Sequence, residues 1–140
     1  MGSEMCIRDR LIGHRLTQTP GSSDYFLEGV VAYSNAAKNS RLEVSPTLIR
    51  KYGAVSEEVA LAMADGIRKT SDADIGLSVT GVAGPDASNN KPVGTVFIAI
   101  SDEEKSNCKY FRFYNDRNCN KEKSAQAGLD LLRRWFLNRI

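Results

Sequence analysis

Two neighbouring polar groups in the first half of the chain could take part in chemistry. Tyr33-Ser34-Asn35 is followed, about one helical turn further on, by the amine of Lys38. A lysine held near other groups in a partly dry site loses proton affinity, so it can act as a base toward a hydroxyl nucleophile. Judged by residue type alone, a helix lysine is more often solvated, by roughly three to one. The segment therefore offers a candidate general base, and a solvated lysine is the alternative.

Two further segments could act on a carbonyl or a phosphate. Thr80-Gly81 offers a hydroxyl and a backbone N–H, which are suited to orienting a carbonyl or holding an oxyanion. Arg117 carries a planar guanidinium that could clamp a phosphate. The alternative for Arg117 is a surface arginine paired with Asp116, and local evidence favours it.

Other kinds of site are not indicated. Neither the phosphate-loop pattern nor G-x-G-x-x-G occurs. The three cysteines lack metal-ligand spacing, and the one histidine, His14, is best explained as a surface or packing residue. We therefore predict no metal and no cofactor.

Length and charge limit the class of protein. A chain of 140 residues fits one domain, and its net charge of +2 does not predict nucleic-acid binding. The apolar runs are too short to cross a bilayer, so we expect no membrane partner and a cytoplasmic location. The sequence leaves homo-oligomer formation open.

The candidate residues must be positioned by strands and helix starts. Ile75, Leu77 and Val79 alternate with small residues, which predicts a strand that ends at Thr80. A glycine turn, a polar loop at 86–90 and a second strand at 95–100 follow. Together they predict a ligand rim, although spacing alone favours an ordinary loop by about two to one.

Further elements follow from caps and periodicity. Ser45-Pro46 starts a helix that Gly53 ends, and Ser56 caps the next helix. The predicted apolar stripe of that next helix is Val59, Ala60, Met63, Ala64 and Ile67. A short, buried strand is predicted at 29–33 and a long strand around 110–113, and a closing helix runs from about residue 121 to the end. Its expected core stripe is Ala125, Leu129, Leu132 and Phe136. Alternating strands and helices predict a three-layer α/β/α sandwich with a mixed, mostly parallel sheet.

Taken together, these segments resemble a known family. The matching segments are Leu16-Thr17 with Pro20-Gly21-Ser22-Ser23, Gly29 to Asn35 with Lys38, Gly53 to Ala60, Thr80 to Pro85, Lys91 to Val96, and Asp116-Arg117. They occur in the order found in the CinA C-terminal domain, the nicotinamide-nucleotide amidase (PncC) family. The resemblance covers the chain from Leu11 to the C-terminus.

The resemblance implies a function and a set of roles. The family hydrolyses the carboxamide of nicotinamide mononucleotide to nicotinic acid nucleotide and ammonia, in pyridine nucleotide recycling, with a serine nucleophile and a lysine base. On this basis the substrate is a small-molecule nucleotide and Lys38 is the general base, with Tyr33 as a supporting donor. Thr80 and Gly81 would line the amide or oxyanion site. Ser34, Asn35 and Arg117 would bind substrate, with Arg117 at the phosphate.

The first ten residues depart from the family pattern. The family's serine lies in an Ala-Glu-Ser-Cys-Thr-Gly-Gly segment, which should end just before Leu11. Met5 to Arg10 instead back-translates to the end of a transposase adapter used in sequencing libraries. Cys6 falls at the serine position without the Thr-Gly-Gly turn, a match that we interpret as coincidental.

We therefore predict that residues 1–10 are a non-native leader. Residues 11–140 would then be an amidohydrolase domain that lacks its first strand and helix. This copy would be inactive without the serine segment. The alternative function is a non-catalytic nucleotide-binding or regulatory module.

Overall fold

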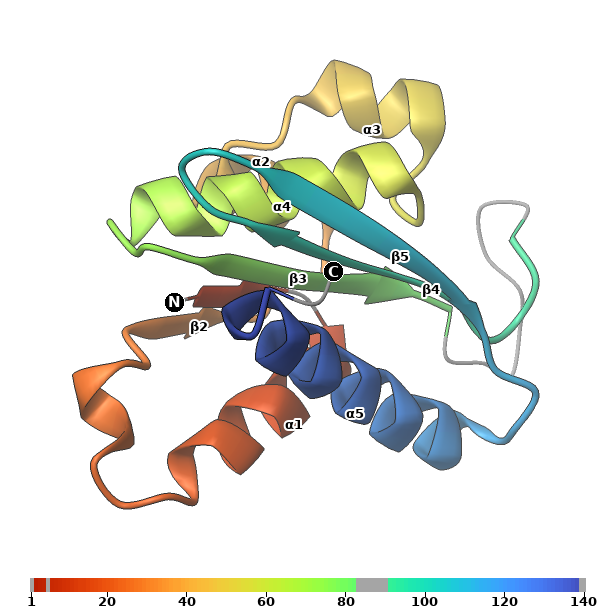
Figure 1. The fold of residues 1–140 in the computed structure, drawn as a ribbon. Coiled ribbons are helices and arrows are strands. Elements are labelled where there is room, and N and C mark those ends of the chain that lie inside the picture. Colours follow the sequence, from red (N-terminus) through yellow and green to blue (C-terminus); the bar gives the residue numbers. More distant parts are fainter. Residues whose placement is uncertain (1, 5, 83–90, 139–140) are drawn as a thin grey trace.

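A five-stranded sheet separates two layers of helices (Figure 1). The computed structural model describes residues 2–4, 6–82 and 91–138, with side chains from Leu11 onward. The strands are β1 (Gly2–Glu4), β2 (Glu28–Val30), β3 (Gly76–Gly81), β4 (Thr95–Ser101) and β5 (Ser106–Arg112). Their spatial order is β2-β1-β3-β4-β5. The predicted three-layer α/β/α sandwich is confirmed.

The prediction of a mostly parallel sheet was wrong. β1 pairs in parallel with β2 and β3, whereas β4 pairs antiparallel with β3 and β5. Parallel neighbours need a crossover connection that carries the chain back along the sheet, but β4 and β5 are joined by a tight turn. In that turn the Asp102 carboxylate accepts the backbone N–H groups of Glu104 and Lys105, each at 2.8 Å. A turn this short can only reverse the chain.

The helices divide between the two faces of the sheet (Figure 1). One face carries α1 (Cys6–Thr17) and α5 (Arg117–Phe136), and the short 3-10 helix η1 (Ser22–Asp24) contacts α1. The other carries α2 (Asn35–Leu42), α3 (Pro46–Tyr52) and α4 (Glu57–Thr70). No helix among residues 2–4, 6–82 and 91–138 is long and apolar enough to cross a membrane.

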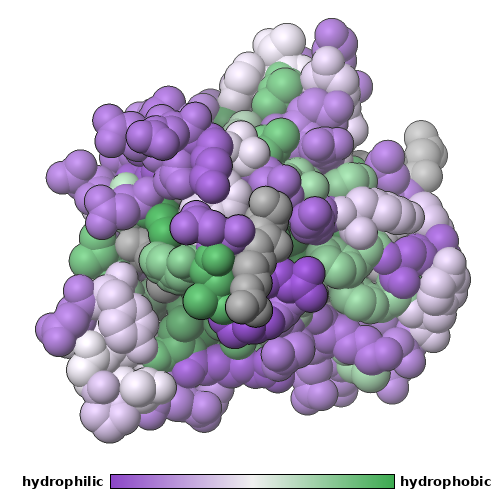
Figure 2. All heavy atoms as spheres, in the orientation of Figure 1, coloured by the Kyte–Doolittle hydropathy of each residue, from purple (hydrophilic) through white to green (hydrophobic). Residues whose placement is uncertain are grey.

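Alternation along the central strands supplies a core to each layer. Leu77 and Val79 of β3 face α1 and α5, where they pack with Ile12, Ile98 and Trp135. Ala99 of β4 faces the opposite layer and packs against Ala60 and Ala64 of α4. Figure 2 shows hydrophilic residues over much of both helix layers, with hydrophobic residues exposed between them. The central strands are therefore buried on both sides, and the strand predicted from the alternating run at 75–79 is confirmed.

Caps set the helix boundaries that lead to the site. The Ser56 hydroxyl accepts the backbone N–H of Val59 at 3.3 Å at the start of α4, as predicted. α4 buries the expected apolar stripe, which comprises Val59, Ala60, Met63, Ala64 and Ile67. Helix α5 begins at Arg117 rather than near residue 121, because the Asp116 carboxylate accepts the N–H of Cys119 at 2.9 Å. Arg117 is thus the first residue of a helix.

Two other expectations differ from the structure. Strand β2 lies at the edge of the sheet and is largely exposed, whereas we expected a buried strand at 29–33. Phe136 is 63% exposed and Trp135 takes the core position, because the stripe of α5 shifts by one residue in its last turn. Residues 2–4 form β1, and residues 6–10 form the start of α1. β1 lies between β2 and β3 and pairs with both through its backbone, which requires an extended chain but no particular side chain.

Candidate active site

The strand directions bring most of the candidate residues to one edge of the sheet. β1, β2 and β3 are parallel, and β5 is parallel to β3 because both pair antiparallel with β4. The four strands therefore end at the same edge, called the carboxyl edge below (Figure 1). Tyr33 to Asn35 follow β2, Thr80 and Gly81 end β3, and Arg117 follows β5. In α/β sheets, ligands bind at this edge.

Lys38 is buried. Its side chain lies on α2 and is only 5% exposed, and its Nζ donates to the carbonyl oxygen of Ala32 at 3.3 Å. Residue type alone favoured a solvated lysine, so burial is the finding that separates Lys38 from an ordinary helix lysine. The amine is held against the segment that joins β2 to α2.

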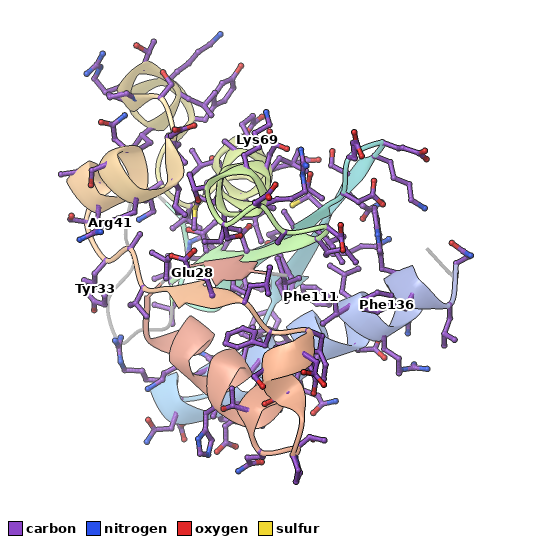
Figure 3. All side chains as sticks on the ribbon, turned by 90° about the vertical axis from the view of Figure 1, so that its left-hand side faces the viewer. Glu28, Tyr33, Arg41, Lys69, Phe111 and Phe136 are labelled. Carbon is purple, nitrogen blue, oxygen red and sulfur yellow. The ribbon has the colours of Figure 1, made fainter. Side chains whose placement is uncertain are left out.

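The Tyr33–Asn35 segment starts helix α2. The Ser34 hydroxyl accepts the backbone N–H of Ala37 at 3.0 Å and caps the helix, and Asn35 is its exposed first residue. Tyr33 is 65% exposed and follows β2, and in Figure 3 it lies at the opposite end of the view from Phe136. Its phenol therefore faces solvent. Ser34 contributes to the site by fixing the start of α2 above Lys38.

The Thr80 hydroxyl donates its hydrogen bond within the protein. Its side chain is 2% exposed, and its hydroxyl donates to the Ala54 carbonyl oxygen at 2.7 Å. The proton of that hydroxyl cannot also be donated to an oxyanion. The bond instead ties the end of β3 to the loop that precedes α4.

Gly81 lies where two strands meet closely. A Cβ at this position would lie 2.5 Å from the Thr95 carbonyl oxygen and 2.9 Å from a methyl carbon of Val96. Glycine is therefore required by the pairing of β3 with β4. The rest of the predicted rim, at residues 83–90, lies outside the described residues.

Several helices begin at the carboxyl edge. α1, α2 and α5 start within a few residues of the ends of β1, β2 and β5, and the Thr80–Ala54 bond brings the start of α4 to the same edge. Helix N-termini carry partial positive charge and favour anions. Glu57 and Glu58 in the first turn of α4 offset part of this field. The edge as a whole suits a ligand with an anionic group.

Arg117 is exposed at the first position of α5. The neighbouring Asp116 carboxylate caps the helix through the Cys119 N–H. Asn120 was not among the predicted site residues. It is fully buried, and both polar atoms of its side-chain amide are bonded to the backbone of Asn115. Its sequence signal is a polar residue in register with the buried stripe of α5.

A cavity of about 490 Å³ lies elsewhere, between η1, the start of β3 and the end of α5. Its lining includes Leu27, Ile75 and Phe136, and it lies at the opposite edge of the sheet from Thr80. Among the residues with described side chains, no group of histidine, cysteine and acidic residues could hold a metal ion. None of the predicted site residues lines this cavity, so the carboxyl edge is the better candidate site.

Comparison with known proteins agrees with the fold and with the order of the segments. The CinA C-terminal domain family matches residues 11–136. A CinA-like protein of Desulfotalea psychrophila is 50% identical over 131 residues, which cover 93% of this chain and 32% of that protein. A CinA-like protein of Salinibacter ruber is 48% identical over 125 residues, 89% of this chain and 30% of the relative. The chain thus spans about a third of these relatives.

Solved structures show the same architecture. A CinA superfamily protein from Escherichia coli superposes with a TM-score of 0.92 at 25% identity, covering 96% of this chain and 78% of the other. A competence/damage inducible protein from Agrobacterium tumefaciens gives a TM-score of 0.89 at 32% identity, covering 94% and 81%.

Proposed function

Because this chain belongs to the CinA C-terminal domain family, we propose that its domain is built to hydrolyse the carboxamide of nicotinamide mononucleotide. The products would be nicotinic acid nucleotide and ammonia, within pyridine nucleotide recycling. The observation that carries the proposal is the burial of the Lys38 amine near the carboxyl edge, where Gly81 and Arg117 also lie. A buried amine is the form of lysine suited to act as a base.

The proposed reaction needs a nucleophile, a base and an anion site. A serine hydroxyl attacks the carboxamide carbon while Lys38 takes its proton. The tetrahedral intermediate then collapses, and the proton leaves with ammonia. Water hydrolyses the resulting ester, which releases the carboxylate and restores the serine. Amides are poor electrophiles, so both an activated nucleophile and stabilisation of the oxyanion are required.

The remaining residues take supporting roles in this proposal. Gly81 lines the amide site. Thr80 positions Gly81 through its bond to Ala54 and does not donate to the oxyanion. Arg117 meets the phosphate at the start of α5, where the helix dipole also favours an anion. Tyr33 and Asn35 border the substrate, and Ser34 acts through the cap of α2.

A second function is favoured by the sequence at the start of α1. Cys6 is the first residue of that helix, at the serine position, and Ile7-Arg8-Asp9-Arg10 replaces the family's turn. Without the serine segment, the chain would bind the mononucleotide and not turn it over. We therefore propose that the chain as written is a nucleotide-binding module derived from the enzyme.

One experiment tests both functions. Residues 4–10 are replaced by Ala-Glu-Ser-Cys-Thr-Gly-Gly, and ammonia release from nicotinamide mononucleotide is measured for this restored chain and for the original. We expect release only from the restored chain and saturable binding by both. A folded restored chain that releases no ammonia would remove the amidase proposal, and absence of binding by both chains would remove the binding proposal.

A further inference from the structure

Asn120 is an unusual residue for the interior of a helix layer. It lies in the first turn of α5, is fully buried, and carries a polar amide that must find hydrogen-bond partners there. Its Nδ2 donates to the carbonyl oxygen of Asn115 at 2.8 Å, and its Oδ1 accepts the N–H of Asn115 at 3.2 Å. One side chain therefore satisfies both backbone groups of a single loop residue.

These two bonds join the residue before the helix cap, Asn115, to the first turn of α5. Asn115 is followed by the cap Asp116, whose carboxylate accepts the N–H of Cys119, and the N–H of Asn120 reaches the Asp116 carbonyl at 2.9 Å. Arg117 lies between these anchored residues. Its backbone is thus held from both sides, although its side chain is exposed.

We infer that Asn120 is a positioning residue for Arg117 and sets the phosphate specificity of the site. The inference rests on the proposed function, because it assigns the fixed guanidinium to the phosphate of the mononucleotide. An arginine on a fixed backbone loses less freedom when it binds a phosphate than one on a mobile loop. The two bonds from Asn120 to Asn115 should therefore strengthen binding of the phosphate and not change binding of the nicotinamide and ribose.

The test compares two ligands that differ only in the phosphate. Binding of nicotinamide mononucleotide and of nicotinamide riboside to the 140-residue chain is measured by calorimetry. The variants are Asn120→Leu, which removes both bonds without adding charge, and Asn118→Leu, which makes the same change at an exposed neighbour. A melting curve checks that each variant folds. Asn120→Asp, which keeps the acceptor and loses the donor, replaces Asn120→Leu if that variant does not fold.

We expect Asn120→Leu to weaken binding of the mononucleotide about tenfold, because ordering a freed loop and the Arg117 side chain then counts against binding, and to leave binding of the riboside unchanged. Asn118→Leu should change neither. Equal weakening for both ligands, or no weakening for either, would overturn the inference.

Backbone amide exchange separates this inference from the proposed function. In Asn120→Leu, exchange at residues 115–119 should accelerate relative to the rest of α5, and in Asn118→Leu it should not. If the unmodified chain fails to bind the mononucleotide, the proposed function falls and the assignment of Asn120 to phosphate specificity falls with it. Accelerated exchange would then still establish that Asn120 holds residues 115–119 in place, and unchanged exchange would refute this claim too.

Discussion

The Thr80 hydroxyl and the Ala54 carbonyl oxygen, 26 residues apart in sequence, lie 2.7 Å apart in the fold. This bond joins the end of a central strand to the loop that starts α4. The same loop is held a second time by the Ser56 hydroxyl, which donates to the Gly53 carbonyl at 2.8 Å. The hydroxyls of Thr80 and Ser56 therefore hold the loop between α3 and α4 in place at the carboxyl edge.

Replacing Thr80 by valine should destabilise the protein without changing its shape. Valine has nearly the volume of threonine, but it leaves the Ala54 carbonyl without its donor. We expect a loss of about 1–3 kcal/mol in the free energy of unfolding, measured by urea denaturation. Thr80→Ser keeps the hydroxyl and is the matched control. A loss in Thr80→Ser that is not matched in Thr80→Val would mean that the methyl group, rather than the hydrogen bond, carries the stability.

Gly94 and Gly21 allow backbone strain to be separated from a steric clash. Both have positive φ, 87° and 84°. A Cβ on Gly94 would lie 1.7 Å from the Phe113 carbonyl oxygen, whereas one on Gly21 would meet nothing within 4 Å. Gly21→Ala should cost about 1–2 kcal/mol for the left-handed backbone, and Gly94→Ala should cost clearly more. Denaturation midpoints that fall equally would contradict the steric argument.

Lys38 can be tested in the chain with the restored serine segment. Lys38→Met keeps the length of the side chain and removes the base, so ammonia release should fall by roughly 10²- to 10⁴-fold. The melting temperature should fall modestly, because methionine fills the same buried position, where Lys38 is 5% exposed, but the bond from Nζ to the Ala32 carbonyl oxygen is lost. Lys123→Met, at an exposed lysine of α5, should leave the rate unchanged. Full activity in Lys38→Met would exclude it as the base.

Cys108 should react slowly with alkylating agents. Burial, with a smaller contribution from Glu57 and Glu58, raises the pKa of its thiol to about 12. The reactive thiolate should keep increasing up to that pH, so the alkylation rate followed by mass spectrometry should rise with pH well past 9. Levelling near pH 9 would show that the thiol has an ordinary pKa.

The same pKa shift has a consequence for stability. The folded state favours the neutral thiol, so this contribution is fully present below the ordinary thiol pKa of 9.0 and is lost as pH rises from there toward 12. A Cys108→Ala variant should therefore lose less stability than the parent chain over this range. Parallel stability curves for the two proteins would refute the linkage.

Local signals predicted much of the scaffold because they act over a few residues. Ser56, Pro46 and the α4 stripe lie where the sequence placed them, since caps and amphipathic periods depend on neighbours in the chain. The strands at 76–81 and 95–101 followed from alternation in the same way. The direction of β4 did not, because pairing depends on the connection and not on the strand's own residues.

The site was predicted in part, for a related reason. Segment order indicated Lys38 and Arg117, but only packing could show that the Lys38 amine is buried and that the Thr80 hydroxyl points to Ala54. No sequence motif marks Asn120, because its partners are the backbone N–H and carbonyl oxygen of residue 115. Any residue except proline would offer both groups at that position. The roles given to Tyr33 and Asn35 remain predictions.

The turn between β4 and β5 contacts Trp135, whose fluorescence can report on the packing of α5 against that turn. Trp135 is the single tryptophan of the sequence, and its indole N–H donates to the Asp102 carboxylate at 3.1 Å while the Lys105 ammonium lies 4.5 Å from the ring centre. A charged pair around one indole makes its emission sensitive to any separation of the end of α5 from the hairpin. Fluorescence at a single wavelength could therefore follow the docking of the last helix in real time, without any label.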